Sequence, residues 1–246
     1  MFNDKTIFAF IPAKTNSIGL PGKMYKKIGE YSLFEWTLLA AHKSSYVDEI
    51  VVSTDDLQIQ KDIESFSYKC LTSLQLQPKK VQFVHRPKEL CTSTSKTEEA
   101  ITHFLNEYYS YRNKDYMVLL QATSPVRWKG LLDSCIEACI GTHDSLITVD
   151  RHTPFFWRKN NETKNTYPLY SLKNRPMRQD ILDDEFFYKD NGNIYITKVE
   201  KFIENKIRVS GKVKLYETDQ YASMQIDDND EYEILKIVHQ HFGDFV

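Results

Sequence analysis

The sequence predicts an α/β fold in which a mostly parallel sheet is covered by helices on both faces. Short runs of β-branched and aromatic residues alternate with longer segments that carry apolar residues at helical spacing. Two of the runs, 7–11 and 116–121, are almost continuously apolar, as strands buried on both faces are. The chain has 246 residues, which is enough for one α/β domain with a substantial core.

The expected elements follow one another along the chain as strand and then helix. The strands are expected at 7–11, 49–56, 81–84, 116–121, 145–149, 193–196 and 212–216. The helices are expected at 32–42, from the end of the second strand to about 67, and at 98–109, 128–140, 199–205 and 231–241. Ser32 with Glu35 three residues later has the pattern of a capping box. The polar segment 71–80 is expected to be a loop.

The segment 152–189 interrupts this alternation. It is polar and aromatic, and it is rich in Asn and Pro. We therefore expect residues 1–246 to form a single domain from which 152–189 leaves as an arm or a small antiparallel excursion.

Composition excludes several classes of protein. The formal net charge of −2 gives no basic surplus, so a nucleic-acid partner is not expected. No apolar run approaches the roughly 20 residues that span a membrane, and the N-terminus lacks the pattern of a signal peptide. A cytoplasmic protein without a membrane partner is expected. Cys135, Cys139 and His143 repeat every four residues, but too few ligands accompany them for zinc, and buried reduced thiols are expected instead.

The loop that follows the first strand has the composition of a phosphate-binding loop. Gly19 and Gly22 allow the backbone to turn and approach a ligand closely, and Lys14 and Lys23 bring positive charge. Backbone N–H groups and lysines at the carboxyl end of a first strand would suit a phosphate. A Walker loop and a dinucleotide fingerprint are both absent. An ordinary surface loop rich in Gly and Pro therefore remains the alternative.

Polar residues also follow the other predicted strands, where an open parallel sheet binds its ligands. They are Ser53–Asp56, Arg86, the hydroxyl cluster at 92–97, and Gln121 with Thr123 and Ser124. Structural roles are the alternative: Asp56 and Thr97 could cap helices, and Arg86 could pair with Glu89. The acidic stretch 225–231 could hold Mg²⁺ together with substrate phosphates, or could be a solvated helix N-terminus.

In this order, the motifs resemble those of the acylneuraminate cytidylyltransferase family, which includes CMP-sialic acid and CMP-legionaminic acid synthetases. The opening motif is I-P-A-K at 11–14 followed by S-I-G-L-P-G-K-M at 17–24. The remaining motifs are S-T-D at 53–55, R-P-K-E-L at 86–90, L-L-Q-A-T-S-P-V-R at 119–127, R-Q at 178–179, N-G-N-I-Y-I at 191–196 and I-D at 226–227.

The resemblance implies a Rossmann-like, three-layer α/β/α nucleotidyltransferase fold whose irregular segment 152–189 is a dimerisation arm. It implies transfer of CMP from CTP to the anomeric hydroxyl of a sialic-acid-like nonulosonic acid, with release of pyrophosphate. The expected cofactor is Mg²⁺, the expected substrates are CTP and a 2-keto sugar acid, and a homodimer is expected.

The resemblance also assigns residues to roles. The catalytic residues would be Lys14, Lys23 and Asp227, and the metal ligands Asp227 and Asp228. CTP would be bound by Ala13, Lys14, Asn16, Ser17, Lys23, Arg86, Thr94, Ser95 and Thr97. The sugar acid would be bound by Gln121, Arg178, Gln179, Lys189 and Asn191.

The sequence departs from the family pattern at several of these motifs. Lys14 replaces an arginine, Ile18 a lysine, Met24 an asparagine and Gln225 the first aspartate of the terminal motif. Lys189 and Asp190 stand where an arginine commonly precedes N-G. Two alternatives therefore stay open: an octulosonate-type sugar acid as acceptor, and a degenerate nucleotide-binding protein without catalysis.

Overall fold

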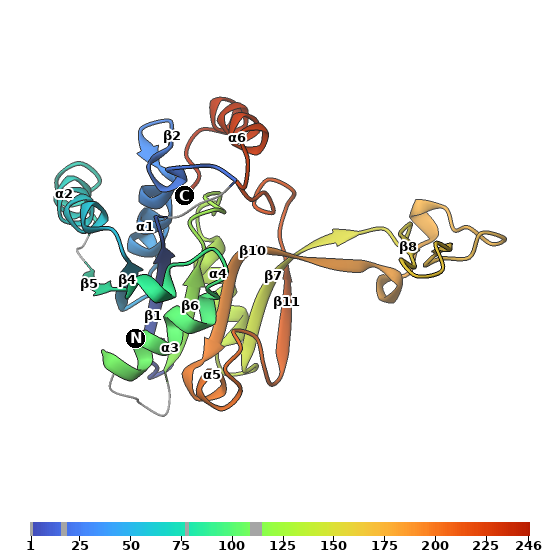
Figure 1. Ribbon diagram of the computed structural model, residues 1–246, viewed down its shortest axis with the longest axis horizontal. Coiled ribbons are helices and arrows are strands. Elements are labelled where there is room, and N and C mark those ends of the chain that lie inside the picture. The colour runs from blue at the N-terminus through green and yellow to red at the C-terminus, as the bar shows by residue number, and fades with distance from the viewer. Residues whose placement is uncertain (1, 16–18, 77–78, 109–114) are drawn as a thin grey trace.

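A single seven-stranded sheet forms the centre of the protein in the computed structural model, which describes residues 2–15, 19–76, 79–108 and 115–246 (Figure 1). The strand order is β11-β7-β10-β6-β1-β4-β5. The strands are β1 (Ile7–Ala13), β4 (Glu49–Thr54), β5 (Lys80–His85), β6 (Tyr116–Leu120), β7 (Ser145–His152), β10 (Phe187–Lys198) and β11 (Val213–Glu217).

The expected mostly parallel sheet is confirmed, and β10 is its one antiparallel strand in the part of the chain that is described. β10 runs antiparallel to both β6 and β7, whereas all the other pairs are parallel. Nothing in the sequence indicated this reversal, because a buried apolar run looks the same whichever direction the strand takes.

Two hydrophobic cores, one on each face of the sheet, confirm the expected three-layer architecture. Alternate residues of β1 point to opposite faces, with Ile7, Ala9 and Ile11 in the larger core and Phe8 and Phe10 in the smaller. Helices α1 (Leu33–Lys43), α2 (Leu57–Ser73), α4 (Leu131–Cys139) and α6 (Asn229–Phe242) contribute to the larger core. Helices α3 (Thr97–Glu107) and α5 (Val199–Asn205) cover the other face.

Several expected boundaries were wrong by a few residues. The expected loop 71–80 is shorter, because α2 continues to Ser73 and β5 begins at Lys80. α4 begins at Leu131 instead of at residue 128. The capping box is confirmed, since Ser32 N donates to Glu35 Oε2 (2.8 Å) and Glu35 N donates to Ser32 Oγ (3.2 Å).

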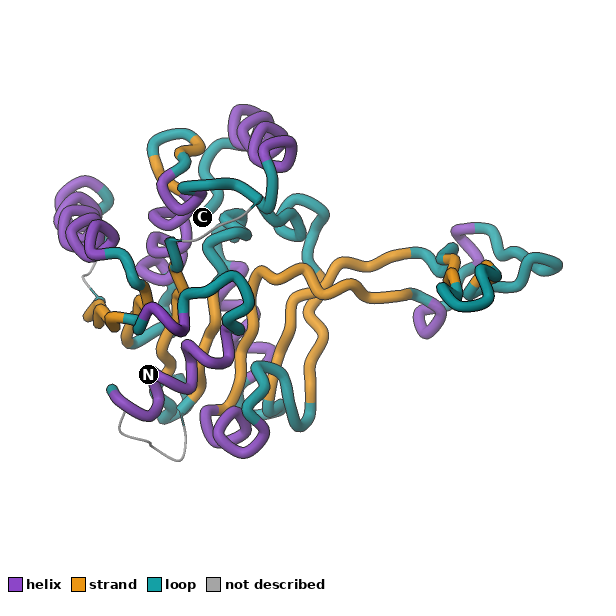
Figure 2. Tube along the Cα trace, viewed as in Figure 1, coloured by secondary structure: helices purple, strands orange, loops and turns teal. Residues whose placement is uncertain are grey.

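An arm projects from one end of the sheet (Figures 1 and 2). β7 and β10 are longer than expected, because they continue to pair beyond the sheet body, from Asp190 with Val149 to Phe187 with His152. Between them lie the hairpin β8 (Trp157–Lys159) and β9 (Thr166–Pro168) and the 3-10 turns η3 (Arg178–Asp180) and η4 (Asp183–Glu185). Large apolar side chains are exposed along the arm: Phe156, Trp157, Tyr167, Leu169, Leu172, Met177, Leu182, Phe187 and Tyr188.

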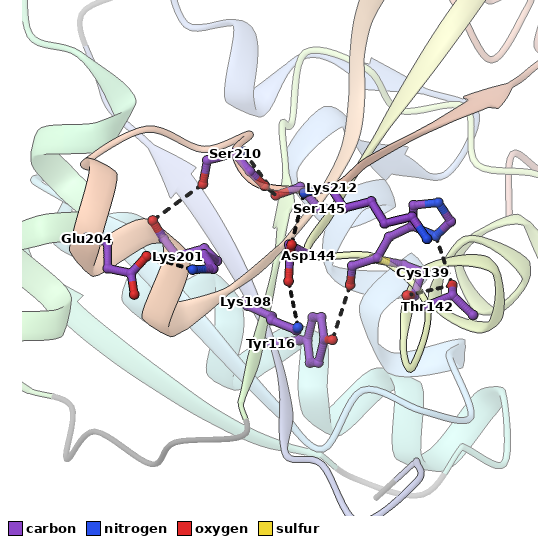
Figure 3. Close-up of polar contacts among 11 residues, drawn as sticks. Tyr116, Cys139, Thr142, Asp144, Ser145, Lys198, Lys201, Glu204, Ser210 and Lys212 are labelled. Atoms are coloured by element: carbon purple, nitrogen blue, oxygen red, sulfur yellow. Dashed lines mark hydrogen bonds and ion pairs between the residues drawn. The ribbon is translucent and has the colours of Figure 1, made fainter.

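At the end of the sheet opposite the carboxyl ends of its parallel strands, Asp144 joins the end of β10 to the segment before β11 (Figure 3). Its carboxylate accepts hydrogen bonds from Lys198 Nζ (2.6 Å) at the end of β10 and from Lys212 N (2.9 Å) before β11.

Cys135 and Cys139 are free thiols buried in α4, and burial raises the pKa of the Cys139 thiol to about 12. The expectation of buried reduced thiols is confirmed, and the described residues contain no group of three or more His, Cys, Asp or Glu side chains that could together hold a metal ion.

The order of the strands places a crevice beside β1. From β1 the chain adds β4 and β5 on one side and then returns to add β6 on the other. In open α/β sheets, ligands bind outside the carboxyl ends of the strands at such a reversal. Among the described residues, no helix is long and apolar enough to span a bilayer.

Candidate active site

A cavity of about 360 Å³ lies at the carboxyl ends of β1 and β6. Five segments that are distant in sequence line it. The lining residues are Pro12, Lys14, Gly19, Lys23, Met24, Arg86, Ser93, Ser95, Lys96, Thr97, Gln121, Ala122, Thr123 and Asp227. Most of the expected rim, namely the opening loop, Arg86, the hydroxyl cluster, Gln121 and Thr123, meets at this cavity, whereas Ser53–Asp56 and Ser124 do not line it.

Lys23 and Asp227 form an ion pair at this cavity. Lys23 Nζ lies 3.1 Å from Asp227 Oδ1 and also donates to the backbone oxygen of Ile226 at 3.2 Å. The Lys23 side chain is 13% exposed, whereas that of Asp227 is 67% exposed. Lys23 is therefore largely buried and held by two acceptors, whereas the Asp227 carboxylate remains accessible to a ligand.

Gly19 brings the opening loop against the same acidic segment. A Cβ at position 19 would lie only 2.2 Å from the backbone oxygen of Asp227. No other residue type could make this approach without moving one of the two segments. The close approach that the glycines suggested is thus made to another part of the chain.

The base of the opening loop is fixed to the ends of neighbouring segments. Lys14 Nζ donates to the Thr92 backbone oxygen at 3.0 Å. Asp55, which follows β4, accepts from Thr15 N (3.0 Å) and Thr15 Oγ1 (2.7 Å). Partial burial alone would raise the pKa of Asp55. The hydrogen bonds from Thr15 act in the opposite direction and outweigh burial, so the pKa lies below its ordinary value. Ala13 is the buried last residue of β1, and Asn16 and Ser17 lie outside the described residues.

Arg86 lies at the buried side of the cavity with only 3% of its surface exposed. Its Nε donates to Ser53 Oγ (3.0 Å) and its Nη2 to Ser53 O (2.6 Å). The ladder between β4 and β5 pairs Ser53 with Val84, so the two strands bring the arginine and its acceptor together. Burial lowers the pKa of Arg86 from its ordinary value. No pairing with Glu89 is seen among the described residues.

The hydroxyl cluster before α3 also contributes to the cavity. Ser95 and Thr97 line it, and Thr94 lies within 3.2 Å of Thr92 through their hydroxyl oxygens. Thr97 is the first helical residue and Lys96 occupies the N-cap position, so Thr97 is not the cap. Asp56 does have its capping role, because it accepts from Gln58 N (2.8 Å) at the start of α2.

The predicted sugar-binding residues are divided among three places. Gln121 lines the main cavity. Lys189 and Asn191 line a second cavity of about 400 Å³, which shares Asp227 with the first. Asn191 is only 2% exposed, and its amide bonds Thr148, Thr218 and Ser223 inside the fold. Arg178 and Gln179 lie on the arm in η3, outside both cavities of the same chain.

The predicted metal ligands have different surroundings. Asp227 faces the main cavity, but Asp228 caps α6 by accepting from Glu231 N at 2.9 Å. Gln225 Nε2 donates to the Asn191 backbone oxygen at 2.8 Å, so it does not replace the missing carboxylate. A site with one accessible carboxylate fits Mg²⁺, which takes one or two carboxylates and completes its shell with phosphates and water.

Seven of the lining residues have no role among those that the resemblance assigned: Pro12, Gly19, Met24, Ser93, Lys96, Ala122 and Thr123. Lys96 and Ser93 lie inside the hydroxyl cluster, and Thr123 lies inside a quoted motif, so proximity to assigned residues was the available signal. Met24 is 8% exposed and belongs to the larger core. Its replacement of a polar residue therefore gives the cavity an apolar patch of wall.

The chain is similar to known enzymes in sequence and in fold. Residues 8–140 match the family model described as Cytidylyltransferase. The chain is 26% identical over 239 residues to the N-acylneuraminate cytidylyltransferase of Escherichia coli O18:K1:H7, which covers 95% of this chain and 52% of that protein. It is 30% identical over 206 residues to the CMP-N,N'-diacetyllegionaminic acid synthase of Legionella pneumophila, which covers 81% of each.

The relatives differ from this chain in length, and solved structures share its fold. The chain spans about half the length of the Escherichia coli relative, with 52% of that protein covered. Among solved structures, it is similar to CMP:2-keto-3-deoxy-manno-octonic acid synthetase complexed with CTP, with a TM-score of 0.62. That match covers 96% of this chain and 99% of the other at 12% identity, and at this identity the likeness is one of fold.

Proposed function

Since the chain belongs to the cytidylyltransferase family, we propose that it transfers CMP from CTP to the anomeric hydroxyl of a sialic-acid-like nonulosonic acid and releases pyrophosphate. One observation carries the proposal: the main cavity combines Lys14, Lys23 and Arg86 with Asp227 at the carboxyl ends of β1 and β6. Three cations with one accessible carboxylate suit a nucleoside triphosphate and its metal ion.

The chain's own residues would act by positioning and by neutralising charge. Lys14 and Lys23, from the opening loop, would hold the triphosphate. Arg86 and the hydroxyls of Ser95 and Thr97 would hold the cytidine and ribose. The sugar hydroxyl would then attack the α-phosphorus in line with the departing pyrophosphate, whose developing charge the lysines would stabilise.

Asp227 would hold Mg²⁺ jointly with the triphosphate. The fit rests on its accessible carboxylate, 67% exposed, beside Lys23. Mg²⁺ bound there would supply charge neutralisation at the phosphates. Because CTP is a cytoplasmic nucleotide, a cytoplasmic location is part of the proposal.

The arm supports a homodimer as part of the proposal. Its exposed apolar side chains would be covered by a second copy of the chain. An arm that reaches a second copy could bring Arg178 and Gln179 to that copy's site, which they do not approach within their own chain. The guanidinium of Arg178 would suit the carboxylate of the sugar acid.

One specific observation favours the alternative of a degenerate nucleotide-binding protein without catalysis. The Gln225 amide donates to the Asn191 backbone oxygen, at the position where the family has a carboxylate. Pyrophosphate release should be measured with CTP, Mg²⁺ and a panel of N-acetylneuraminate, N,N'-diacetyllegionaminate and 3-deoxy-manno-octulosonate. Turnover with a nine-carbon acid supports the proposal. Preference for the octulosonate would change the acceptor, and CTP binding without turnover on any acid would favour the degenerate reading.

A further inference from the structure

Arg127 is a buried cation that the proposed reaction does not use. It is 2% exposed, and burial is what lowers its pKa, to about 9. In the described part of the chain, it forms no ion pair with a carboxylate. A buried charge without a counter-ion is destabilising, and an apolar side chain of similar volume would fill the space at lower cost. Its position therefore calls for a role that depends on its hydrogen bonds.

Those hydrogen bonds go to the end of β6 and to a residue inside β10. Arg127 Nη2 donates to the backbone oxygens of Gln121 (2.8 Å) and Asn193 (3.1 Å). The last pair of the ladder between β6 and β10 is Leu120 with Ile194. Gln121 and Asn193 are the next residues outward, where the two strands no longer bond each other. The guanidinium thus bridges the strands at the point where their ladder stops.

The two bridged segments support the wall of the main cavity. Gln121 lines that cavity, and Gly192 precedes the other bridged residue. A Cβ at Gly192 would lie 1.6 Å from Gln225 Nε2 and 3.2 Å from Gln121 Oε1, so the two amides pack against this glycine. Gln225 is two residues from Asp227. A shift of either bridged segment would therefore move Gln121 relative to the acidic segment.

We propose that Arg127 is a positioning residue, which fixes the Gln121 side chain for the acceptor sugar by joining the carboxyl end of β6 to β10 at Asn193. This inference rests on the proposed function. A flat guanidinium can donate to several carbonyl oxygens held in fixed directions, whereas a lysine ammonium is a single point charge on a flexible stem. Arg127→Lys therefore keeps the charge and loses the bridge.

The chain offers a matched control at the third hydrogen bond of the same guanidinium. Arg127 Nη1 donates to Thr37 Oγ1 (3.1 Å), which belongs to α1 and to neither of the bridged strands. Thr37→Val removes this acceptor at nearly constant volume. Loss of packing around Arg127 would be common to both variants, whereas loss of the strand bridge occurs only in Arg127→Lys.

The test measures initial rates for the wild type, Arg127→Lys, Thr37→Val, Gln121→Ala and the double variant Gln121→Ala/Arg127→Lys, with CTP and the acid that turns over best. We expect Arg127→Lys to lower kcat/KM for the acid by at least about tenfold, since misplacement by a fraction of an ångström is enough. KM for CTP should stay within about twofold, and Thr37→Val should match the wild type. In the Gln121→Ala background, Arg127→Lys should cost little more.

Three results would overturn the inference: equal rises in both KM values, additive losses in the double variant, or wild-type kinetics in Arg127→Lys. Amide hydrogen exchange keeps the test independent of turnover, because Arg127→Lys should raise exchange in peptides covering 120–124 and 191–194, and unchanged exchange would also overturn it. A wild-type protein that turns over no acid would instead defeat the proposed function. An unfolded Arg127→Lys variant, with no CTP binding, would mean a structural role only.

Discussion

At the scale of single residues, the site depends on contacts that join the two ends of the chain. Lys23 meets Asp227 through an ion pair at 3.1 Å, and Gly19 lies against the backbone of the same aspartate. The sequence identified all three as candidates from their types and motifs. It could not pair them, because no local rule connects residues about two hundred positions apart.

Asp227→Asn tests the accessible carboxylate. The amide keeps the size of the side chain but loses the charge that Mg²⁺ requires, so turnover should fall at least about a hundredfold while CTP affinity changes by less than about fivefold. Pyrophosphate release and CTP titration measure the two effects. The matched control is Asp230→Asn in the exposed first turn of α6. Near-normal turnover in Asp227→Asn would remove this residue from the metal site.

Gly19→Ala tests the close approach of the opening loop. Its Cβ would lie 2.2 Å from the Asp227 oxygen, so the loop or the acidic segment must move and turnover should drop by about tenfold or more. Gly22→Ala is the control, since a Cβ there meets nothing within 4 Å and only its φ of +66° is unfavourable. That strain costs about 1 kcal/mol of stability and should spare the rate. Equal rates in both variants would contradict the role of the contact.

At the scale of elements, a boundary with a signal in neighbouring residues was easier to predict than a boundary set by a distant partner. The capping box of α1 depends on two residues three positions apart, Ser32 and Glu35, and it formed as expected. β7 and β10 run on past their apolar cores because they pair with each other there, from Val149 to His152. Polar residues can extend a strand when a partner satisfies their backbone groups, and that partner is not visible in a local pattern.

His42 should make the packing of α1 sensitive to acid. It is 5% exposed, and burial lowers its pKa to about 4. In the unfolded chain, the imidazole binds a proton near pH 6.5, whereas in the folded protein it does so only near pH 4. Stability should therefore fall as the pH drops through this window, by as much as about 3 kcal/mol, and should not change above it on this account.

Urea unfolding at several pH values measures this effect. His42→Leu should flatten the fall in unfolding free energy between pH 6.5 and about 4. His241→Leu, on the exposed side of α6, is the control for loss of one histidine. The same slope in the wild type and in His42→Leu would show that other groups cause any acid sensitivity.

Arg178, in the 3-10 turn η3 of the arm, gives a prediction about acceptor binding that can be tested separately from CTP binding. Arg178→Ala should raise KM for the sugar acid at least about tenfold and leave KM for CTP within about twofold, because a carboxylate would lose its bidentate partner. Steady-state kinetics with both substrates varied measure the split. Arg175→Ala is the control, since Arg175 lies over the Phe155 ring within the arm at 4.4 Å from its centroid. Equal changes in both KM values would place Arg178 elsewhere.

At the scale of the whole molecule, the arm predicts self-association. Leu172, Met177 and Leu182 are 60%, 64% and 65% exposed, far more than a buried core residue would be. Replacing Leu172 and Leu182 with serine should convert a dimer to a monomer in sedimentation velocity at micromolar protein. Ile237→Ser, 64% exposed on α6, should leave the association unchanged. A wild-type monomer, or a dimer unaffected by the arm variant, would contradict the proposed interface.

The sequence by itself determined the alternation of strands and helices, the strand ends that carry polar residues, and the order of motifs that resembles one family. These follow from periodicity, capping and composition, which act between neighbours along the chain. Lys14, Lys23, Arg86, Gln121 and Asp227 were identified in this way, and the fold gathers all five around one cavity.

Only the tertiary structure decided the direction of β10, the length of the arm, the separation of Arg178 from its own chain's cavity, and the bridge made by Arg127. Each depends on which distant backbone atoms are left without a partner when the strands assemble. Such distant atoms meet only in the folded protein. The sequence therefore shows the charge of Arg127 but not the two carbonyl oxygens that it joins.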